Sequence, residues 1–131
     1  MPKEIVHVPG VSDGLLKANV PISAAVKANG FVFVSGQPPI DPETGTIGIT
    51  DVKAQTHLVL NNVKSCLEAA GSSMEQVVKV TIFITNAAYF ATVNEIYKTY
   101  FPQDPPARTF VTMASWPMTF DVEIECIAVT D

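Results

Sequence analysis

The chain has 131 residues, of which 47% are hydrophobic and 16% are charged, and its net charge is −5. This length predicts one domain, spanning residues 1–131, with a sizeable buried core. Its eight Lys and Arg residues form no basic run, which argues against nucleic acid and an anionic membrane as partners, because both are bound through clustered positive charge. The low charge is typical of an obligate oligomer, although a well-packed apolar monomer has the same composition.

The N-terminus and the cysteines predict a cytoplasmic protein without a metal. Residues 1–4 begin no apolar signal-peptide core, and no stretch has the length of a transmembrane helix. Cys66 and Cys126 fall inside expected elements, which indicates buried, reduced thiols. Two histidines, His7 and His57, and the lack of a Cys-x-x-Cys motif give no metal signature, and no cofactor is expected.

The N-terminal part of the chain is predicted to form strands. Residues 1–20 contain repeated turn signals and are expected to be irregular, apart from a short strand at residues 3–8. Residues 23–28 and 31–36 each have the composition of a strand. The Asn29-Gly30 pair between them predicts a type I′ hairpin, because both residues tolerate a positive φ.

An amphipathic pattern predicts the first long helix at residues 51–70, where apolar residues recur at steps of three and four. Asp51 or Thr50 can cap its N-terminus with a side-chain oxygen. Gly71 stands where a residue in the left-handed conformation commonly ends a helix. Both ends of this helix are therefore defined by the sequence.

The second half of the chain predicts one strand, a helix and two more strands. Residues 77–85 are nearly all β-branched or aromatic, as in a buried strand. Residues 86–101 carry an aromatic stripe at helical spacing, which we interpret as core, and Pro102 ends that helix. The order β-β-β-α-β-α-β-β predicts an α+β domain with two helices on one face of a mixed sheet.

The last two expected strands carry the residues that are the best candidates for substrate binding and catalysis. Arg108, the only arginine, begins one strand directly after Pro105-Pro106. We expect a hairpin in which the loop at residues 115–119 leads to the last strand. Glu123 and Glu125 of that strand lie on one face, because side chains alternate along a strand.

An arginine in a fixed position and a carboxylate on an apolar face favour the capture of a small acid. The planar guanidinium binds a carboxylate through two parallel hydrogen bonds, which lysine cannot imitate. A desolvated glutamate has a raised pKa and can act as a general acid or base. Both features also have a simpler interpretation, as a surface arginine and as a charged strand face that prevents aggregation.

Several motifs together resemble the RidA/YjgF family of reactive-intermediate imine deaminases. The resemblance extends from about residue 23 to the C-terminus, and its motifs are specific only jointly. They are Val34-Ser35-Gly36-Gln37, Asp41-Pro42-x-Thr44-Gly45, Leu67-Glu68-Ala69-Ala70-Gly71, Phe90-Ala91-x-Val93-Asn94-Glu95-x-Tyr97, Pro106-Ala107-Arg108 and Val122-Glu123-Ile124-Glu125-x-Ile127-Ala128. The resemblance implies a chorismate-mutase-like fold and a homotrimer with three sites in the clefts between subunits.

The resemblance also implies roles for individual residues. Arg108 would bind the substrate carboxylate with the help of the backbone N–H of Phe110. Glu123 would position or activate the water that attacks the imine carbon. Three further residues match positions that line or support the cleft, namely Ser35, Gly36 and Asn94.

The chain departs from the family pattern around the expected pocket. Ile22 replaces a tyrosine that follows Gly-Pro in the family's deaminases, and Phe110 stands where cysteine is common. Trp116 replaces the leucine of a Leu-Pro pair, and Phe120 follows in the same loop. These changes predict a more apolar pocket and a substrate other than 2-aminoacrylate, such as an aminomuconate-type product of ring cleavage.

The resemblance and the residues together predict a hydrolytic deaminase of small carboxylate-bearing enamines and imines, which releases ammonia and a 2-oxo acid. An alternative is a non-catalytic trimer that binds small carboxylic metabolites or acts as a holdase. A third function, endoribonuclease, is disfavoured by the acidic charge and the lack of paired histidines.

Overall fold

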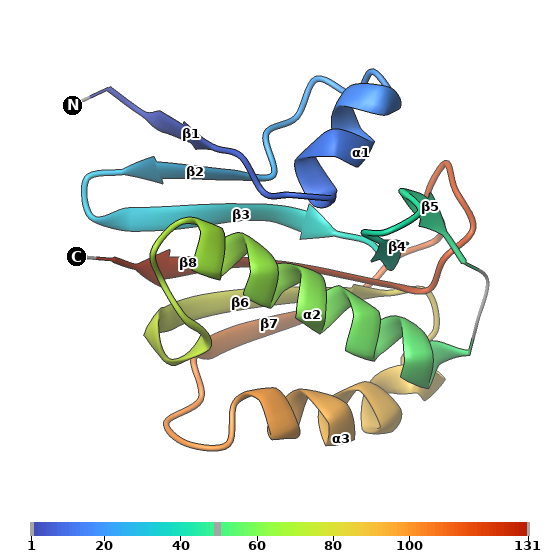
Figure 1. The fold of residues 1–131 in the computed structure, drawn as a ribbon. Helices are drawn as coiled ribbons and strands as arrows, with labels where there is room; N and C mark the ends of the chain where they lie inside the picture. The colour runs from blue at the N-terminus through green and yellow to red at the C-terminus, as the bar shows by residue number, and fades with distance from the viewer. Residues whose placement is uncertain (1, 49–50, 131) are drawn as a thin grey trace.

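The computed structural model describes residues 2–48 and 51–130, which contain a six-stranded mixed sheet (Figure 1). The strand order in this sheet is β1-β2-β3-β8-β6-β7. Its strands are β1 (Glu4–Val6), β2 (Ala25–Ala28), β3 (Phe31–Gln37), β6 (Val77–Ile84), β7 (Ala107–Thr112) and β8 (Val122–Val129). The α-helices are α1 (Val11–Lys17), α2 (Val52–Ala69) and α3 (Phe90–Tyr100), with 3-10 turns η1 (Met74–Gln76) and η2 (Ala87–Tyr89).

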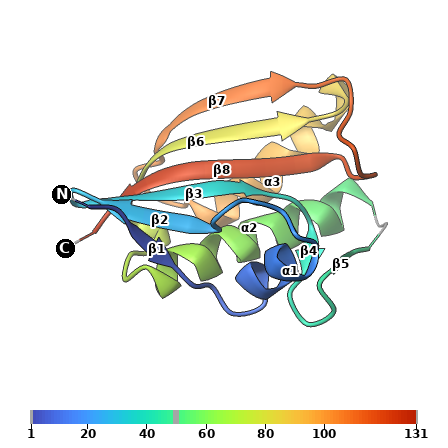
Figure 2. The ribbon, with the colours of Figure 1, turned by 90° about the horizontal axis from the view of Figure 1, so that it is seen from above.

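The helices α2 and α3 cover the same face of the sheet, and among the described residues the opposite face carries no helix (Figures 1 and 2). Side chains of the sheet alternate accordingly. On β8, four side chains are buried beneath the helices, namely Val122, Ile124, Cys126 and Ala128. Glu123, Glu125, Ile127 and Val129 alternate with them on the other face. The predicted α+β class, with two helices on one face of a mixed sheet, is confirmed.

Local chemistry explains the elements that the sequence predicted well. Asn29 has φ 55° and Gly30 has φ 84°, so the two-residue turn between β2 and β3 is of the predicted type I′. The Asp51 carboxylate caps α2 by accepting a hydrogen bond from the Ala54 N–H at 2.8 Å. Gly71, with φ 81°, follows the end of this helix. The alternative cap, Thr50, lies outside the described residues.

The prediction that residues 1–20 are irregular apart from one strand is wrong for the segment that forms α1. The hydroxyl of Ser12 accepts a hydrogen bond from the Val8 N–H at 2.8 Å, and the carboxylate of Asp13 accepts one from the Gly10 N–H at 3.0 Å. These short polar side chains satisfy backbone donors at the helix start, and the buried Val11 anchors it to the core. A second addition is the small hairpin of β4 (Ile40–Asp41) and β5 (Thr46–Ile47).

The prediction that the last two strands form a hairpin is also wrong. β6 lies between them, running parallel to β7 and antiparallel to β8, while β8 also pairs with β3. The β-branched and apolar composition of β6 suits this central position, in which its backbone pairs with neighbouring strands on both edges. β7 is consequently an edge strand. None of the described helices is both long enough and apolar enough to cross a membrane.

Candidate functional site

The carboxylate of Glu123 lies against an irregularity in the neighbouring strand. The pairing of β3 with β8 shifts register between Val34 and Gln37, and Gly36 is inside this bulge. A Cβ at Gly36 would stand 2.5 Å from Oε2 of Glu123, so only glycine leaves room for this side chain. Next to it, the Ser35 hydroxyl donates a hydrogen bond to the Ser23 carbonyl at 2.7 Å.

The environment of Glu123 changes its acidity. Burial raises the pKa of its carboxyl, and the negative charge of Glu125 on the same strand face raises it further. A carboxylate in this state is a better proton acceptor than an ordinary surface glutamate. A desolvated glutamate with a raised pKa was one of the two interpretations that the sequence left open for this strand face.

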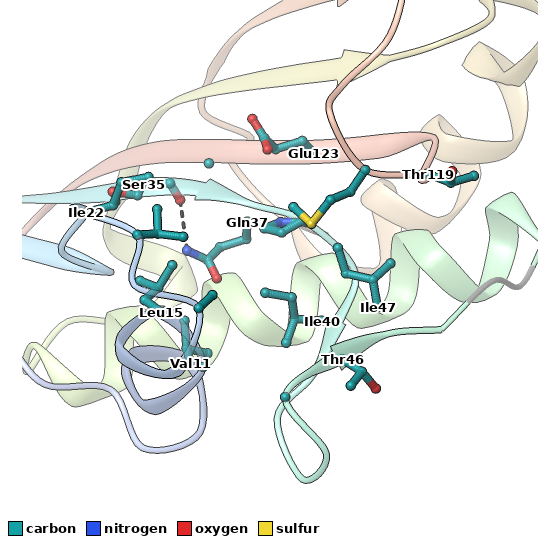
Figure 3. Close-up of a pocket in the computed structure, with 17 residues that line it drawn as sticks. Val11, Leu15, Ile22, Ser35, Gln37, Ile40, Thr46, Ile47, Thr119 and Glu123 are labelled. Atoms are coloured by element: carbon teal, nitrogen blue, oxygen red, sulfur yellow. Dashed lines mark hydrogen bonds between the residues drawn. The ribbon is translucent and has the colours of Figure 1, made fainter.

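A cavity of about 630 Å³ opens beside Glu123 (Figure 3). Its walls come from α1, from the bulge of β3, from the β4–β5 hairpin and from the loop before β8. Ser35, Gly36 and Ile22, which the family resemblance assigned to a substrate pocket, are among the residues that line this cavity. Gln37, which sequence reasoning did not select, is 3% exposed and donates a hydrogen bond from Nε2 to the Ser35 carbonyl at 3.0 Å.

The loop before β8 contributes different residues from those expected. The side chains of Trp116 and Phe120 stack on each other, with ring centroids 4.4 Å apart. Met118 and Thr119, between them, line the cavity instead. The sequence singled out this loop, but which of its side chains face the cavity depends on the fold.

The end of this loop is fixed by a hydrogen-bond network centred on Asp121. The side chain of Gln55, in α2, donates to Asp121 Oδ2 at 3.0 Å and accepts from the Asp121 N–H at 2.7 Å. The Thr85 hydroxyl donates to Asp121 Oδ1 at 2.8 Å. Because Glu123 is only two residues further on, this network also sets the start of the strand that carries it.

Arg108 belongs to a second cluster, formed by β7 and α3. Its Nη1 donates a hydrogen bond to Asn94 Oδ1 at 2.7 Å. Its guanidinium carbon lies 4.9 Å from the ring centroid of Tyr97 and 5.2 Å from that of Phe110. Phe110 in turn packs against Phe90 with centroids 4.7 Å apart. The aromatic rings and Asn94 hold the guanidinium in one place next to a cavity of about 400 Å³.

The guanidinium of Arg108 lies over the ring of Tyr97, which is uncharged. Its hydroxyl is buried without a hydrogen-bond partner among the described residues. Burial raises the pKa of Tyr97 to about 12, although the charge of Arg108 lowers it. The ring beneath the guanidinium is therefore an uncharged π surface at neutral pH.

A single chain does not bring Arg108 and Glu123 together. Arg108 pairs with Val80 of β6, and Glu123 pairs with Phe83 of the same strand. Positions three apart on a strand point to opposite faces. Arg108 is therefore on the helix side of the sheet and Glu123 on the open side, two strands away.

The described residues offer no metal site and no reactive thiol. They contain no group of three or more His, Cys, Asp or Glu residues that could hold a metal ion. Cys66 and Cys126 are free and buried, as predicted. Burial raises the pKa of both thiols to about 12, so that neither is a thiolate at neutral pH.

We predict that Gly36→Ala displaces the Glu123 carboxylate, because the new methyl group would occupy its position. The Glu123 carboxyl should then titrate nearer to its ordinary value in an NMR titration, and overpacking should cost about 1–3 kcal/mol of stability. Gly48→Ala is the matched control, since a Cβ at Gly48 meets nothing within 4 Å. An unchanged Glu123 titration in Gly36→Ala would show that the contact does not hold the carboxylate.

Comparison with known proteins places this arrangement in a family. A family model described as Endoribonuclease L-PSP matches residues 14–130. A RutC family protein of Pyrococcus horikoshii is 47% identical over 108 residues, which are 82% of this chain and 86% of that protein. The chloroplastic Reactive Intermediate Deaminase A of Arabidopsis thaliana is 46% identical over 108 residues, 82% of this chain and 58% of that protein.

The crystal structure of Escherichia coli TdcF with bound serine superimposes with a TM-score of 0.87 at 38% identity, covering 98% of this chain and 99% of that one. The molecule is thus an α+β protein with the same fold as TdcF. The chain belongs to the RidA/YjgF family, as its motifs predicted, and relatives in that family are named reactive intermediate deaminases.

Proposed function

We propose that this chain is a cofactor-independent hydrolytic deaminase of small carboxylate-bearing imines and enamines. An enamine first tautomerises to the imine. Water then adds to the imine carbon, the carbon–nitrogen bond breaks, and ammonia and a 2-oxo acid are released without electron transfer. Glu123 takes a proton from the attacking water and returns it to the departing nitrogen. Arg108 orients the substrate through its carboxylate.

The observation that carries this proposal is the position of Glu123. Its carboxylate is held against Gly36, its pKa is raised by burial, and it faces a cavity large enough for a small acid. These are the properties of a general base next to a substrate site. In this proposal Ser35, Gly36 and Ile22 contact the substrate near Glu123, and Asn94 positions Arg108.

We further propose that the active form is a homotrimer in which each site combines two subunits. Arg108 and Glu123 are on opposite faces of one sheet. In this proposal, the arginine of each site therefore comes from a neighbouring subunit. The open face of the sheet exposes large apolar side chains, with Phe31 40%, Phe33 44% and Val129 36% exposed. Such a face is typical of an obligate interface. Phe110 would then lie beside the arginine in the shared cleft, whereas Phe120 is buried and, with Trp116 stacked on it, supports the loop that carries Met118 and Thr119.

The names and ligands of relatives support a small carboxylic acid as the substrate. The Arabidopsis relative is named a reactive intermediate deaminase, and the TdcF crystal contains serine, an amino acid with a free carboxylate. The family description also names an endoribonuclease. The net charge of −5 and the single arginine of this chain disfavour binding to an RNA backbone. A cytoplasmic location stays a prediction of the sequence.

The proposed activity is tested by measuring ammonia release from imines that an amino-acid oxidase generates in situ. The panel includes the imine of alanine, which is the tautomer of 2-aminoacrylate, and an aminomuconate-type dicarboxylate. We expect the protein to accelerate release above the spontaneous rate for at least one carboxylated imine. Calorimetric titration with 2-oxo acids separates the alternatives, since binding without turnover of any imine would indicate a non-catalytic carrier.

A further inference from the structure

Helix α2 places two amide side chains in the core of the protein. Gln55 and Asn62 are each 2% exposed, among apolar neighbours such as Val59 and Val63. They are seven residues apart, so both are on the face of the helix that packs against the sheet. Burying an amide costs free energy unless its donors and acceptors find partners. The partners of these two side chains therefore indicate why they are amides and not apolar residues.

Gln55 fixes the chain immediately before β8. Its side chain exchanges two hydrogen bonds with Asp121, one with the carboxylate and one with the backbone N–H. Thr85, directly after β6, completes the anchor, because its N–H donates to the Asp121 carbonyl at 3.1 Å and its hydroxyl donates to the carboxylate at 2.8 Å. Glu123 follows two residues later, after the fully buried Val122. The backbone that leads into Glu123 is thus tied to both α2 and β6.

Asn62 fixes the chain immediately after β3. Its Nδ2 donates a hydrogen bond to the Ile40 carbonyl at 2.7 Å and a longer one to the Pro38 carbonyl at 3.4 Å. Pro38 and Pro39 have no N–H, so the strand ladder stops here and the carbonyls of this turn need other donors. Gly36 lies only two residues before Pro38. Asn62 thus holds the end of the bulge in β3 against α2.

The two fixed segments meet at the carboxylate of Glu123. Gly36 leaves the room that this carboxylate occupies, since a Cβ there would stand 2.5 Å from Oε2. Gln55 fixes the chain two residues before Glu123, and Asn62 fixes it two residues after Gly36. Both amides are on the helix side of the sheet, where α2 contacts β3 and β8 (Figure 1). The carboxylate is on the open side, so the amides act on it through the backbone of the two strands.

We propose that Gln55 and Asn62 are positioning residues for the reaction, which hold β3 and β8 in the arrangement that places the Glu123 carboxylate beside Gly36. This inference rests on the proposed function, because it takes Glu123 as the base. It extends the determinants of activity to two residues that act without touching the substrate. An amide is needed at each position, because an apolar side chain of similar size would fill the space but leave the two segments free to shift.

Loss of either anchor should change the position and the acidity of Glu123 together. A shift of β3 relative to β8 opens the bulge and admits water to the carboxylate. The pKa of Glu123, which burial raises, then falls toward the ordinary value of a glutamate, while the charge of Glu125, the other cause of the raised pKa, stays the same. Displacement of a reacting group by about 1 Å lowers the rate by about a hundredfold. A positioning role thus predicts a loss of rate that is linked to a shift of the pH profile.

The test uses Gln55→Met and Asn62→Leu, which roughly keep the volume of the side chain and remove the amide. With any carboxylated imine that the protein hydrolyses, we expect kcat to fall by about tenfold to a hundredfold. KM should stay within about threefold, because Arg108 belongs to the separate cluster of α3 and β7. The acidic limb of the plot of kcat/KM against pH should move to lower pH. Each variant breaks one anchor, so either tests the proposal if the other does not fold.

Two substitutions in the same helix are matched controls. Thr56 is fully buried, but its hydroxyl donates to the Val52 carbonyl of its own helix at 2.7 Å, so Thr56→Val removes a buried hydrogen bond that fixes no strand. Val59→Ala removes only packing from a fully buried position. Both should lower the urea midpoint, leave kcat within about twofold and leave the acidic limb in place. If kcat fell with stability alone in all four variants, or if the limb did not move in Gln55→Met and Asn62→Leu, the proposal would be overturned.

An NMR titration of Glu123 measures the same effect without any substrate. The pKa of Glu123 should fall in Gln55→Met and Asn62→Leu and keep its wild-type value in Thr56→Val. If the wild-type protein hydrolyses no imine while the titration changes as expected, the deaminase function is wrong and the amides still position the carboxylate. If the wild-type protein hydrolyses imines and both amide variants titrate and react like Thr56→Val, the deaminase function stands and the proposed positioning is wrong.

Discussion

Replacing Arg108 by methionine should lower kcat/KM for every carboxylated imine by at least about a hundredfold while the protein stays folded. The guanidinium is held by Asn94 and lies over the ring of Tyr97, which fixes its orientation before any ligand binds. Loss of a charge-assisted, bidentate contact to a carboxylate removes both binding energy and the alignment of the imine carbon. Steady-state kinetics measures the loss, and circular dichroism checks the fold.

Lys98→Met is the matched control for this variant. Lys98 lines the same cavity as Arg108 and carries the same charge, but the hydrogen bond to Asn94 and the ring contacts belong to Arg108. Removing it should leave kcat/KM within about threefold, since only a solvent-screened charge is lost. Equal losses in both variants would mean that local positive charge, and not the arginine in its fixed geometry, supports the reaction.

Glu123→Gln should reduce kcat by about 10²–10⁴-fold, the range for loss of a general base. Its amide keeps the shape of the side chain against Gly36 but cannot accept a proton from water. In the wild-type protein, activity should fall as the pH decreases through the pKa of Glu123, which burial places above the ordinary value of a glutamate. Glu125→Gln is the comparison variant, because it keeps the proposed base and removes only the neighbouring charge that raises the pKa of Glu123. It should keep kcat at neutral pH and move the loss of activity to lower pH.

The raised pKa of Glu123 also predicts how the free energy of unfolding depends on pH. The pKa of Glu123 is higher in the folded protein than in the unfolded chain, so ionised Glu123 opposes folding. The contribution of Glu123 to the stability of the folded protein is most favourable below the pKa that the residue has in the unfolded chain, where the carboxyl is protonated. This contribution is lost as the pH rises through its pKa in the folded protein. Glu123→Gln should therefore gain stability relative to wild type at neutral pH and lose this advantage in acid. Urea unfolding at several pH values measures the difference, and a constant difference would contradict the shifted pKa.

The local elements of the fold could be predicted because their signals are short-range. Asn29-Gly30 specifies its own turn, and Asp51 and Gly71 mark the ends of α2 through backbone chemistry that depends on few neighbours. The alternation on β8 likewise predicted that Glu123 and Glu125 share one face of the strand. In each case, the decisive interaction lies within a few residues of the chain.

The arrangement of the candidate site could not be predicted from such signals. Strand patterns do not say which strand lies beside which, so the position of β6 between β7 and β8 was missed. The same error hid the separation of Arg108 from Glu123 on opposite faces. The helix α1 was missed because its start depends on the side chains of Ser12 and Asp13 in a stretch dominated by turn residues.

The position of the Glu123 carboxylate depends on Gly36, a residue that lies far from it in the sequence. Gly36 is an ordinary strand-end glycine in the sequence, and only the pairing of β3 with β8 reveals that a larger residue would collide with the carboxylate. The cavity could not be predicted from the sequence for the same reason, because α1, the β4–β5 hairpin and the loop before β8 meet only in the folded chain.

The central claim is that one active site combines Glu123 of one subunit with Arg108 of another. It is tested most directly by co-expressing Arg108→Met and Glu123→Gln subunits with different tags and isolating mixed trimers. In each isolated mixed trimer, one of the three interfaces pairs two intact residues, so about one third of wild-type activity should return although each parent is inactive. Mixed assemblies no more active than the parents would contradict a site shared between subunits.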